Sequence, residues 1–173
     1  MLSDDDEDED EWPPFKKVGA YDPYSDDPRL AIKKVTLCPT SGKLIVGGTA
    51  GQVVVLEVSA EASDVKLTAI KADLVTEKEG FAWKGHSALS VKPDEVKLEA
   101  GHYHPKFVLQ MSPPASVNSL TFSAEWDLVA SGTAHGLVLF DCVHGVTMLT
   151  KCTLNAQGTN PTPRRQIKCD RKK

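Results

Sequence analysis

The sequence predicts an all-β fold: a partial β-propeller of about two blades, each a four-stranded antiparallel sheet, with disordered termini. Three observations support this prediction. A pattern of short strands recurs after 84 residues, so that Gly48 aligns with Gly132. The segments in each copy are rich in Val, Leu and Ile and are separated by Gly, Ser, Asp and Pro, as in β-hairpins. No stretch approaches the ~20 apolar residues of a membrane-spanning helix, so we expect no transmembrane segment.

The chain opens with two segments that the sequence places outside the blades. Residues 4–11 are eight consecutive acids. Because like charges repel and little can be buried there, we expect residues 1–11 to form a disordered acidic tail. Residues 12–30 combine aromatic side chains, which favour burial, with prolines, which prevent regular structure. They are predicted to form an extended strap on a folded surface.

A first blade is predicted over residues 31–75. Three strands are expected from the segments IKKVTL, LIVGG and QVVVLEV, which turn residues separate. The glycine-rich residues 47–52 lack the Gly-Lys-Ser/Thr ending and the following helix of a phosphate loop, so a tight hairpin is expected there. Residues 66–72 are expected to add the fourth strand.

A second blade is predicted over residues 106–154. Its segments VNSLTF, LVASG and LVLFDC correspond to the three strands of the first copy, and LVASGTAHGLVLFDC aligns with LIVGGTAGQVVVLEV. Residues 148–154 are expected to form the fourth strand of this blade. Residues 107–111, directly before the second copy, are a further candidate strand.

Residues 76–105, between the copies, are interpreted as an insertion loop. A blade typically takes ~40–45 residues, so the repeat offset fits either two blades or one blade with an insertion. The insertion is favoured because this segment lacks the three-strand pattern. Propellers need ~4–8 blades. We therefore expect the outer faces of the two blades to be apolar and unpaired, in a chain that belongs to a longer protein or assembles with another.

The repeat unit resembles a WD40 blade. It has four short strands, a Gly-x-x-x-Gly hairpin and a terminal Leu-Phe-Asp, where Leu-Trp-Asp is usual. Gly85 and His86 are similar to the Gly-His dipeptide of such repeats.

No catalytic, cofactor-binding or metal-binding residue is assigned from the sequence. Two sets of residues are conceivable metal ligands: His86, His102 and His104, and Cys142, His144 and Cys152. A surface pair of histidines and a packed cysteine are the favoured interpretations. The chain has neither a Gly-x-Ser-x-Gly motif nor a cysteine–histidine signature. We expect a protein that is not an enzyme and binds no cofactor. A metal-dependent hydrolase on a propeller is the alternative, and it requires the three histidines to converge.

Charge and cysteine spacing favour a cytoplasmic protein that binds no nucleic acid. The basic residues 164–173 contain no aromatic side chain that could stack on bases, and the middle of the chain is neutral. This basic end could contact an anionic membrane at ~1 kcal/mol per basic residue. The acidic start differs from a signal peptide, and the four cysteines include no Cys-x-x-Cys pair, so reduced thiols are expected.

One ordered set of segments is more specific than these features. An acidic run followed by EWPPFKKVGAYDPYSDDPRLAIKKV, GTAGQVVVLEV, EGFAWKGH and LVASGTAHGLVLFD strongly resembles the lethal giant larvae family over about residues 4–155. The resemblance implies a non-catalytic WD40-type scaffold in cell polarity, cortical cytoskeleton organisation and polarised exocytosis. The implied partners are syntaxin-type SNAREs, non-muscle myosin II and the atypical protein kinase C complex. The implied location is the cell cortex, at the inner face of the plasma membrane.

The end of the chain departs from that family, which continues into a basic, serine-rich loop and a second propeller. Residues 155–173 are basic but contain no serine, and only Thr159 and Thr162 could accept phosphate. We therefore do not expect the switch in which phosphate releases a basic segment from lipid. The chain is expected to be a fragment or truncated isoform. A non-functional truncated segment, aggregating through open strand edges, is the other alternative.

Overall fold

The computed structural model describes residues 28–75, 80–92 and 94–154. The predicted acidic and basic tails and most of the predicted strap lie outside these ranges. The described part contains a short 3-10 helix and eleven strands, so the prediction of an all-β fold is confirmed. In chain order the elements are η1 (Pro28–Leu30), β1 (Ile32–Cys38), β2 (Lys43–Gly48), β3 (Gln52–Val58), β4 (Ser63–Val65), β5 (Ala69–Asp73), β6 (Val96–Leu98), β7 (Tyr103–Ser112), β8 (Ser119–Ser123), β9 (Leu128–Thr133), β10 (Gly136–Asp141) and β11 (Val146–Cys152).

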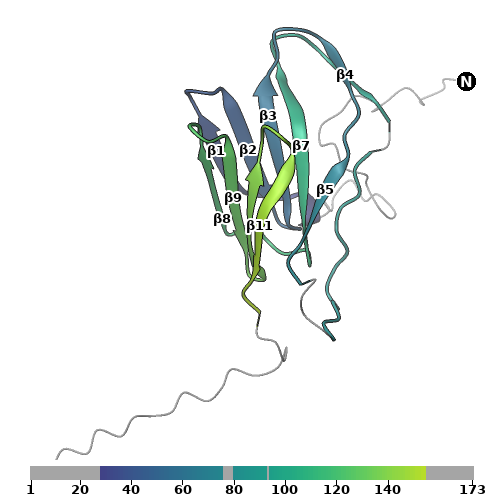
Figure 1. Ribbon diagram of the computed structural model, residues 1–173. Coiled ribbons are helices and arrows are strands. Elements are labelled where there is room, and N and C mark those ends of the chain that lie inside the picture. Colours follow the sequence, from purple (N-terminus) through teal and green to yellow (C-terminus); the bar gives the residue numbers. More distant parts are fainter. Residues whose placement is uncertain (1–27, 76–79, 93, 155–173) are drawn as a thin grey trace, which may run out of the picture.

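Five strands form the first sheet, in the spatial order β1-β2-β3-β7-β5 (Figure 1). β1, β2 and β3 are consecutive antiparallel neighbours, as the first copy of the repeat predicts. The predicted hairpin over residues 47–52 is confirmed, because it joins the paired strands β2 and β3. Gly51 in its turn has φ of 76°, a left-handed backbone that glycine adopts without steric cost.

Four strands form the second sheet, in the order β11-β10-β9-β8. Each pairs antiparallel with the next along the chain, so the sheet is a simple meander. The three strands expected from the second copy are present as β8, β9 and β10. The expected fourth strand over residues 148–154 is also present, shifted toward the N-terminus as β11.

The fourth strand of the first sheet is not the predicted one. Residues 66–72 were expected beside β3, but β7 takes that place and pairs antiparallel with β3. β5, which holds much of the predicted segment, lies outside β7 and runs parallel to it. Val108, Leu109 and Met111 of β7 are almost fully buried. This longer apolar strand fills both faces of the sheet beside β3, whereas β5 is short and partly exposed.

The candidate strand over residues 107–111 therefore exists, but it belongs to the first sheet. The predicted boundaries count residues 106–112 with the second blade, whereas β7 hydrogen-bonds to β3 and β5. The connection from β3 to β7 holds β4, β5 and β6, and β4 pairs with β6 as a two-stranded ribbon. Within the described ranges, no further four-stranded sheet separates the two copies.

The two sheets pack face to face, as neighbouring blades of a partial propeller. Alternate side chains of each sheet point into the layer between them. The fully buried members of this main core include Ile45, Val53, Val55, Val129, Val138 and Phe140. β1 lies near β8 and β5 lies near β11, so the sheets align from one edge to the other. Full burial of one such side chain contributes ~1.5–3 kcal/mol, which makes this layer the main source of stability.

A second, smaller core lies on the opposite face of the first sheet. Val54 and Leu56 alternate with the inward-facing valines of β3 and therefore point away from the second sheet. Together with Val108 they are covered by apolar residues of the β3–β7 connection, namely Leu67, Leu89 and Val91. Figure 1 shows the second sheet on one side of the first sheet and this connection on the other. This outer face was expected to be unpaired, but the chain itself covers part of it.

Candidate interaction surface

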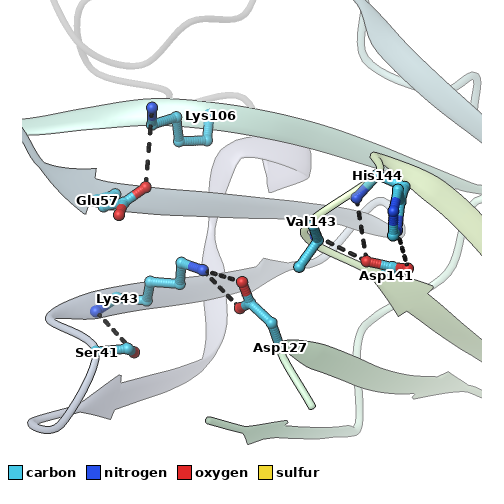
Figure 2. A network of polar contacts seen from close by, with 8 residues as sticks. All are labelled: Ser41, Lys43, Glu57, Lys106, Asp127, Asp141, Val143 and His144. Carbon is cyan, nitrogen blue, oxygen red and sulfur yellow. Dashed lines mark hydrogen bonds and ion pairs between the residues drawn. The ribbon is translucent and has the colours of Figure 1, made fainter. Parts of the chain in front are cut away.

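Lys43 and Asp127 join the two sheets through an ion pair (Figure 2). Lys43 begins β2, and Asp127 directly precedes β9. The Lys43 Nζ donates to both carboxylate oxygens of Asp127 at 2.5 Å and lies 5.8 Å from the centre of the Phe122 ring. The two side chains are only 12% and 25% exposed, so water screens the pair less than an ordinary surface pair. The pair therefore helps to fix how one sheet sits on the other.

Asp127 reaches Lys43 from a turn that few residue types tolerate. Its φ is 52°, in the left-handed region. Asp and Asn visit this region more readily than other residues with a Cβ, because their short polar side chains can hydrogen-bond locally. No sequence-based prediction covered this pair. The available signal was that the two residues are separated by 84 positions, the offset of the repeat, and so occupy aligned places in neighbouring blades.

Asp141 organises the turn between β10 and β11 (Figure 2). Its Oδ1 accepts hydrogen bonds from the backbone N–H groups of Val143 and His144, at 2.7 and 3.1 Å. Its Oδ2 lies 2.7 Å from Nδ1 of His144. The hydrogen bond from the His144 ring, followed by that from the His144 backbone, holds the pKa of the Asp141 carboxyl below its usual range. The His144 ring is thus bound to Asp141 within this turn.

Cysteines of the described part are free thiols in different environments: Cys38, Cys142 and Cys152. Burial, and next the negative charge of Asp127, raise the pKa of the Cys142 thiol to about 12. Hydrogen bonding to the side chain and backbone of Ser41 lowers the pKa of the Cys38 thiol. Because the thiolate is the reactive form, Cys38 is the more reactive of these two residues.

The three histidines considered as metal ligands have separate roles. His104 is 3% exposed, and its Nε2 donates to the backbone carbonyl of Glu99 at 2.8 Å while its Nδ1 lies 3.1 Å from the Ser63 hydroxyl. It therefore fastens the β4–β6 ribbon to β7. His102 is exposed beside Glu99. Across the described ranges, no group of three or more His, Cys, Asp or Glu side chains is placed to hold a metal ion.

His86 belongs to a compact turn of the β3–β7 connection that touches the second sheet. The Trp83 Nε1 donates to the His86 carbonyl at 2.8 Å, and a side chain at Gly85 would collide with the Trp83 ring. The Trp83 ring meets the ring of His135 edge to face, with centroids 5.0 Å apart. His135 lies in the β9–β10 turn. Gly85 and His86 therefore shape a loop that bridges both blades and do not form part of a blade.

Apolar side chains remain exposed at both ends of the stacked sheets. On β1, Val35 and Leu37 are each 58% exposed, and they pair with Val46 and Leu44 on the face away from the second sheet. On the second sheet, Leu137 and Leu149 are each 41% exposed. Leu137 alternates with the buried Val138, so it points away from the first sheet. Exposed apolar faces of this kind mark sites of protein contact.

The described residues thus combine polar contacts within and between the sheets with exposed apolar side chains on their outer faces. The polar side chains of the Lys43–Asp127 pair and of the Asp141 turn bind one another or the neighbouring backbone. None of the helices in the described residues is long and apolar enough to cross a membrane.

No protein-family model matches the chain. The chain is 52% identical over 147 residues to LLGL scribble cell polarity complex component 2 of Mus musculus, an alignment covering 85% of this chain and 14% of that protein. It is 48% identical over 147 residues to Lethal(2) giant larvae protein homolog 1 of Mus musculus, with the same coverage. It is 48% identical over 148 residues to Lethal(2) giant larvae protein of Drosophila melanogaster, covering 83% of this chain and 13% of that protein. The chain therefore spans about 14% of the length of these curated relatives.

Proposed function

This chain belongs to the lethal giant larvae family, and on that basis we propose that it is a non-catalytic protein-interaction scaffold in cell polarity. The observation that carries the proposal is the 52% identity to a protein named as a component of a cell polarity complex. The blade architecture supports it, because propeller blades present faces, edges and loops to other proteins. The exposed leucines of the second sheet are one such face.

The finer proposal concerns the partners and the location. We propose syntaxin-type SNAREs as partners in polarised exocytosis, and non-muscle myosin II and the atypical protein kinase C complex as partners at the cell cortex. Because the chain covers only about 14% of its relatives, each of these partners has to be tested on this chain itself.

Binding is best tested with the purified chain immobilised on a sensor and the cytosolic domain of a plasma-membrane syntaxin in solution. We expect saturable binding that an unrelated helical protein of equal charge does not reproduce. The control variant Leu137→Asp with Leu149→Asp replaces the exposed apolar face with charge while leaving the buried core side chains in place. Loss of binding in this variant would place the syntaxin contact on this face of the second sheet, whereas the absence of saturable binding to the wild-type chain would overturn the syntaxin proposal.

The absence of catalysis needs its own test. The hydrolase alternative requires a bound metal ion, so the purified chain can be measured by inductively coupled plasma mass spectrometry. We expect far less than one metal ion per chain after dialysis. A stoichiometric metal, removed by His104→Ala, would contradict a purely structural role of His104.

A further inference from the structure

The two faces of each sheet can be matched between the blades. The first sheet presents Ile45, Val53 and Val55 to the second sheet, and we call this side of a blade its front face. The second sheet receives them with Val129, Val138 and Phe140, and we call this side of a blade its back face. The interface between the blades is therefore a contact of front on back. Repeated in the same sense, it would add further blades at both ends of the pair.

The front face of the second sheet is open. It carries Leu137 and Leu149, each 41% exposed, and Leu139, which pairs with Leu149. In the alignment of the copies, Leu137 and Leu139 correspond to Val53 and Val55, the residues with which the first sheet binds the second. This end of the pair is thus suited to the back face of another blade.

The back face of the first sheet is occupied instead. Val54 and Leu56 correspond in the alignment to Val138 and Phe140, which in the second sheet receive the preceding blade. Val54, Leu56 and Val108 are 2%, 5% and 0% exposed although no blade precedes them in the described part of the chain. Residues of the β3–β7 connection bury them, chiefly Leu89, which is itself 5% exposed.

The covering segment is attached at several points. β5 is hydrogen-bonded along the free edge of β7, and Ala69 of that strand joins the same small core. His104 of β7 binds Ser63, the first residue of β4, and the backbone of Glu99, which directly follows β6. The Trp83 ring meets His135 across the blades. The coverage ends before β1, where Val35 and Leu37 stay exposed.

We infer that the described residues 59–69 and 80–92 form an intramolecular cap that takes the place of a preceding blade on the back face of the first sheet. The cap makes the blade pair one-sided: the front face of the second sheet is open, while the back face of the first sheet is covered over β3 and β7. A second copy of this chain has the complementary front face, so the cap prevents copies from stacking front on back. A front-on-back contact between two copies leaves one free front face and one free back face. Without the cap, such contacts would therefore continue into an open assembly.

The test compares two substitutions at neighbouring positions of the full chain. Leu89→Asp places a charge in the buried contact between cap and sheet, whereas Ser90→Asp adds the same charge to an exposed side chain. Sedimentation across a range of concentrations measures the mass of the species formed. We expect wild type and Ser90→Asp to stay at or below twice the 18.8 kDa monomer, and Leu89→Asp to grow beyond it. Adding Leu149→Asp to Leu89→Asp removes the open front face and should abolish the growth.

Hydrogen exchange makes the result decisive. In Leu89→Asp the amides of β4 should lose protection while those of β5 and β10 keep it, because the cap is released and Ala72 and Leu74 stay in the core between the sheets. The inference is overturned if that pattern is seen and the mass does not grow, or if wild type itself grows beyond a dimer. If Leu89→Asp also exposes the β10 amides, the milder pair Leu89→Ala with Val91→Ala replaces it under the same criteria.

Discussion

At the residue scale, Cys38 and Cys142 show how position decides the chemistry of one side-chain type. Cys142 directly follows β10 and lies in the core between the sheets, where low polarity and the nearby Asp127 disfavour a thiolate. Cys38 ends β1 beside the hydroxyl of Ser41, which stabilises a thiolate by hydrogen bonding. The sequence predicts reduced thiols for both residues, but it does not separate a reactive thiol from an inert one.

The two thiols should react at very different rates. We expect iodoacetamide at pH 8 to alkylate Cys38 readily and to leave Cys142 unmodified while the protein stays folded, because the pKa of Cys142 is raised to about 12. Peptide mass spectrometry of a time course measures both rates. In urea, where the fold is lost, Cys142 should become alkylated as well. Equal rates in the folded protein would contradict the burial of Cys142.

Asp141 should make stability depend on pH in the acid range. In the folded state the pKa of Asp141 lies below 3.8, its value without neighbouring groups. The ionised side chain therefore makes its full contribution to the stability of the fold above about pH 4. The contribution is lost as the pH falls through the lowered folded pKa. Asp141→Asn keeps an oxygen for the backbone bonds of the turn but removes the charge. We expect the difference in urea midpoint between wild type and Asp141→Asn to shrink from pH 6 to pH 3, and a constant difference would rule out the carboxylate as its cause.

At the scale of elements, the sequence predicts strands better than their partners. β1 to β3 and β8 to β11 are local hairpins, in which alternating apolar residues and turn residues specify the pairing. β7 pairs with β3 across a long connection, and no local pattern encodes that contact. The aromatic–aromatic contact of Phe107 in β7 with Phe140, at 5.5 Å between ring centroids, likewise joins distant segments. The fourth strand of the first sheet was predicted wrongly because residues 66–72 follow β3 sooner along the chain than β7, the strand that pairs with it.

The β2–β3 turn provides a test of element geometry with a matched control. Gly51 and Gly42 both have positive φ, 76° and 68°. A Cβ at Gly51 would lie 2.8 Å from the carbonyl oxygen of Met111, whereas a Cβ at Gly42 would meet nothing within 4 Å. Gly42→Ala should lower the free energy of unfolding by about 1 kcal/mol through backbone strain alone, and Gly51→Ala by up to about 3 kcal/mol. Thermal melts measure both, and equal losses would exclude the close approach to β7.

At the scale of the whole molecule, the Lys43–Asp127 pair links two sheets that otherwise meet through apolar side chains. Apolar packing tolerates small shifts, while an ion pair with short hydrogen bonds has one preferred geometry. The repeat predicts that two blades exist. It does not predict which polar residues meet between them, because that depends on the turn geometry of Asp127. This is why the sequence analysis identified the blades and missed the contact that orients them.

The coupling between these residues can be measured by a double-mutant cycle. Lys43→Met and Asp127→Asn should each lower the free energy of unfolding by about 1–3 kcal/mol, because each leaves a partly buried charge without its partner. Asn is chosen because it tolerates the left-handed backbone of Asp127. The double variant should lose less than the sum of the single losses, by about 0.5–3 kcal/mol. Additive losses in urea denaturation would show that the pair contributes nothing as a pair.

The place of β7 in the first sheet also has a consequence for the order of folding. The second sheet is built from neighbouring segments between Ser119 and Cys152, whereas the first sheet remains incomplete until Tyr103–Ser112 has reached β3. Contacts between distant segments form more slowly because a long loop must close first. In pulse-labelling hydrogen exchange during refolding, β8 to β10 should therefore gain protection before β7. The blade that comes first along the chain would then be the last to be finished, because the free edge of β3 stays open until β7 pairs with it.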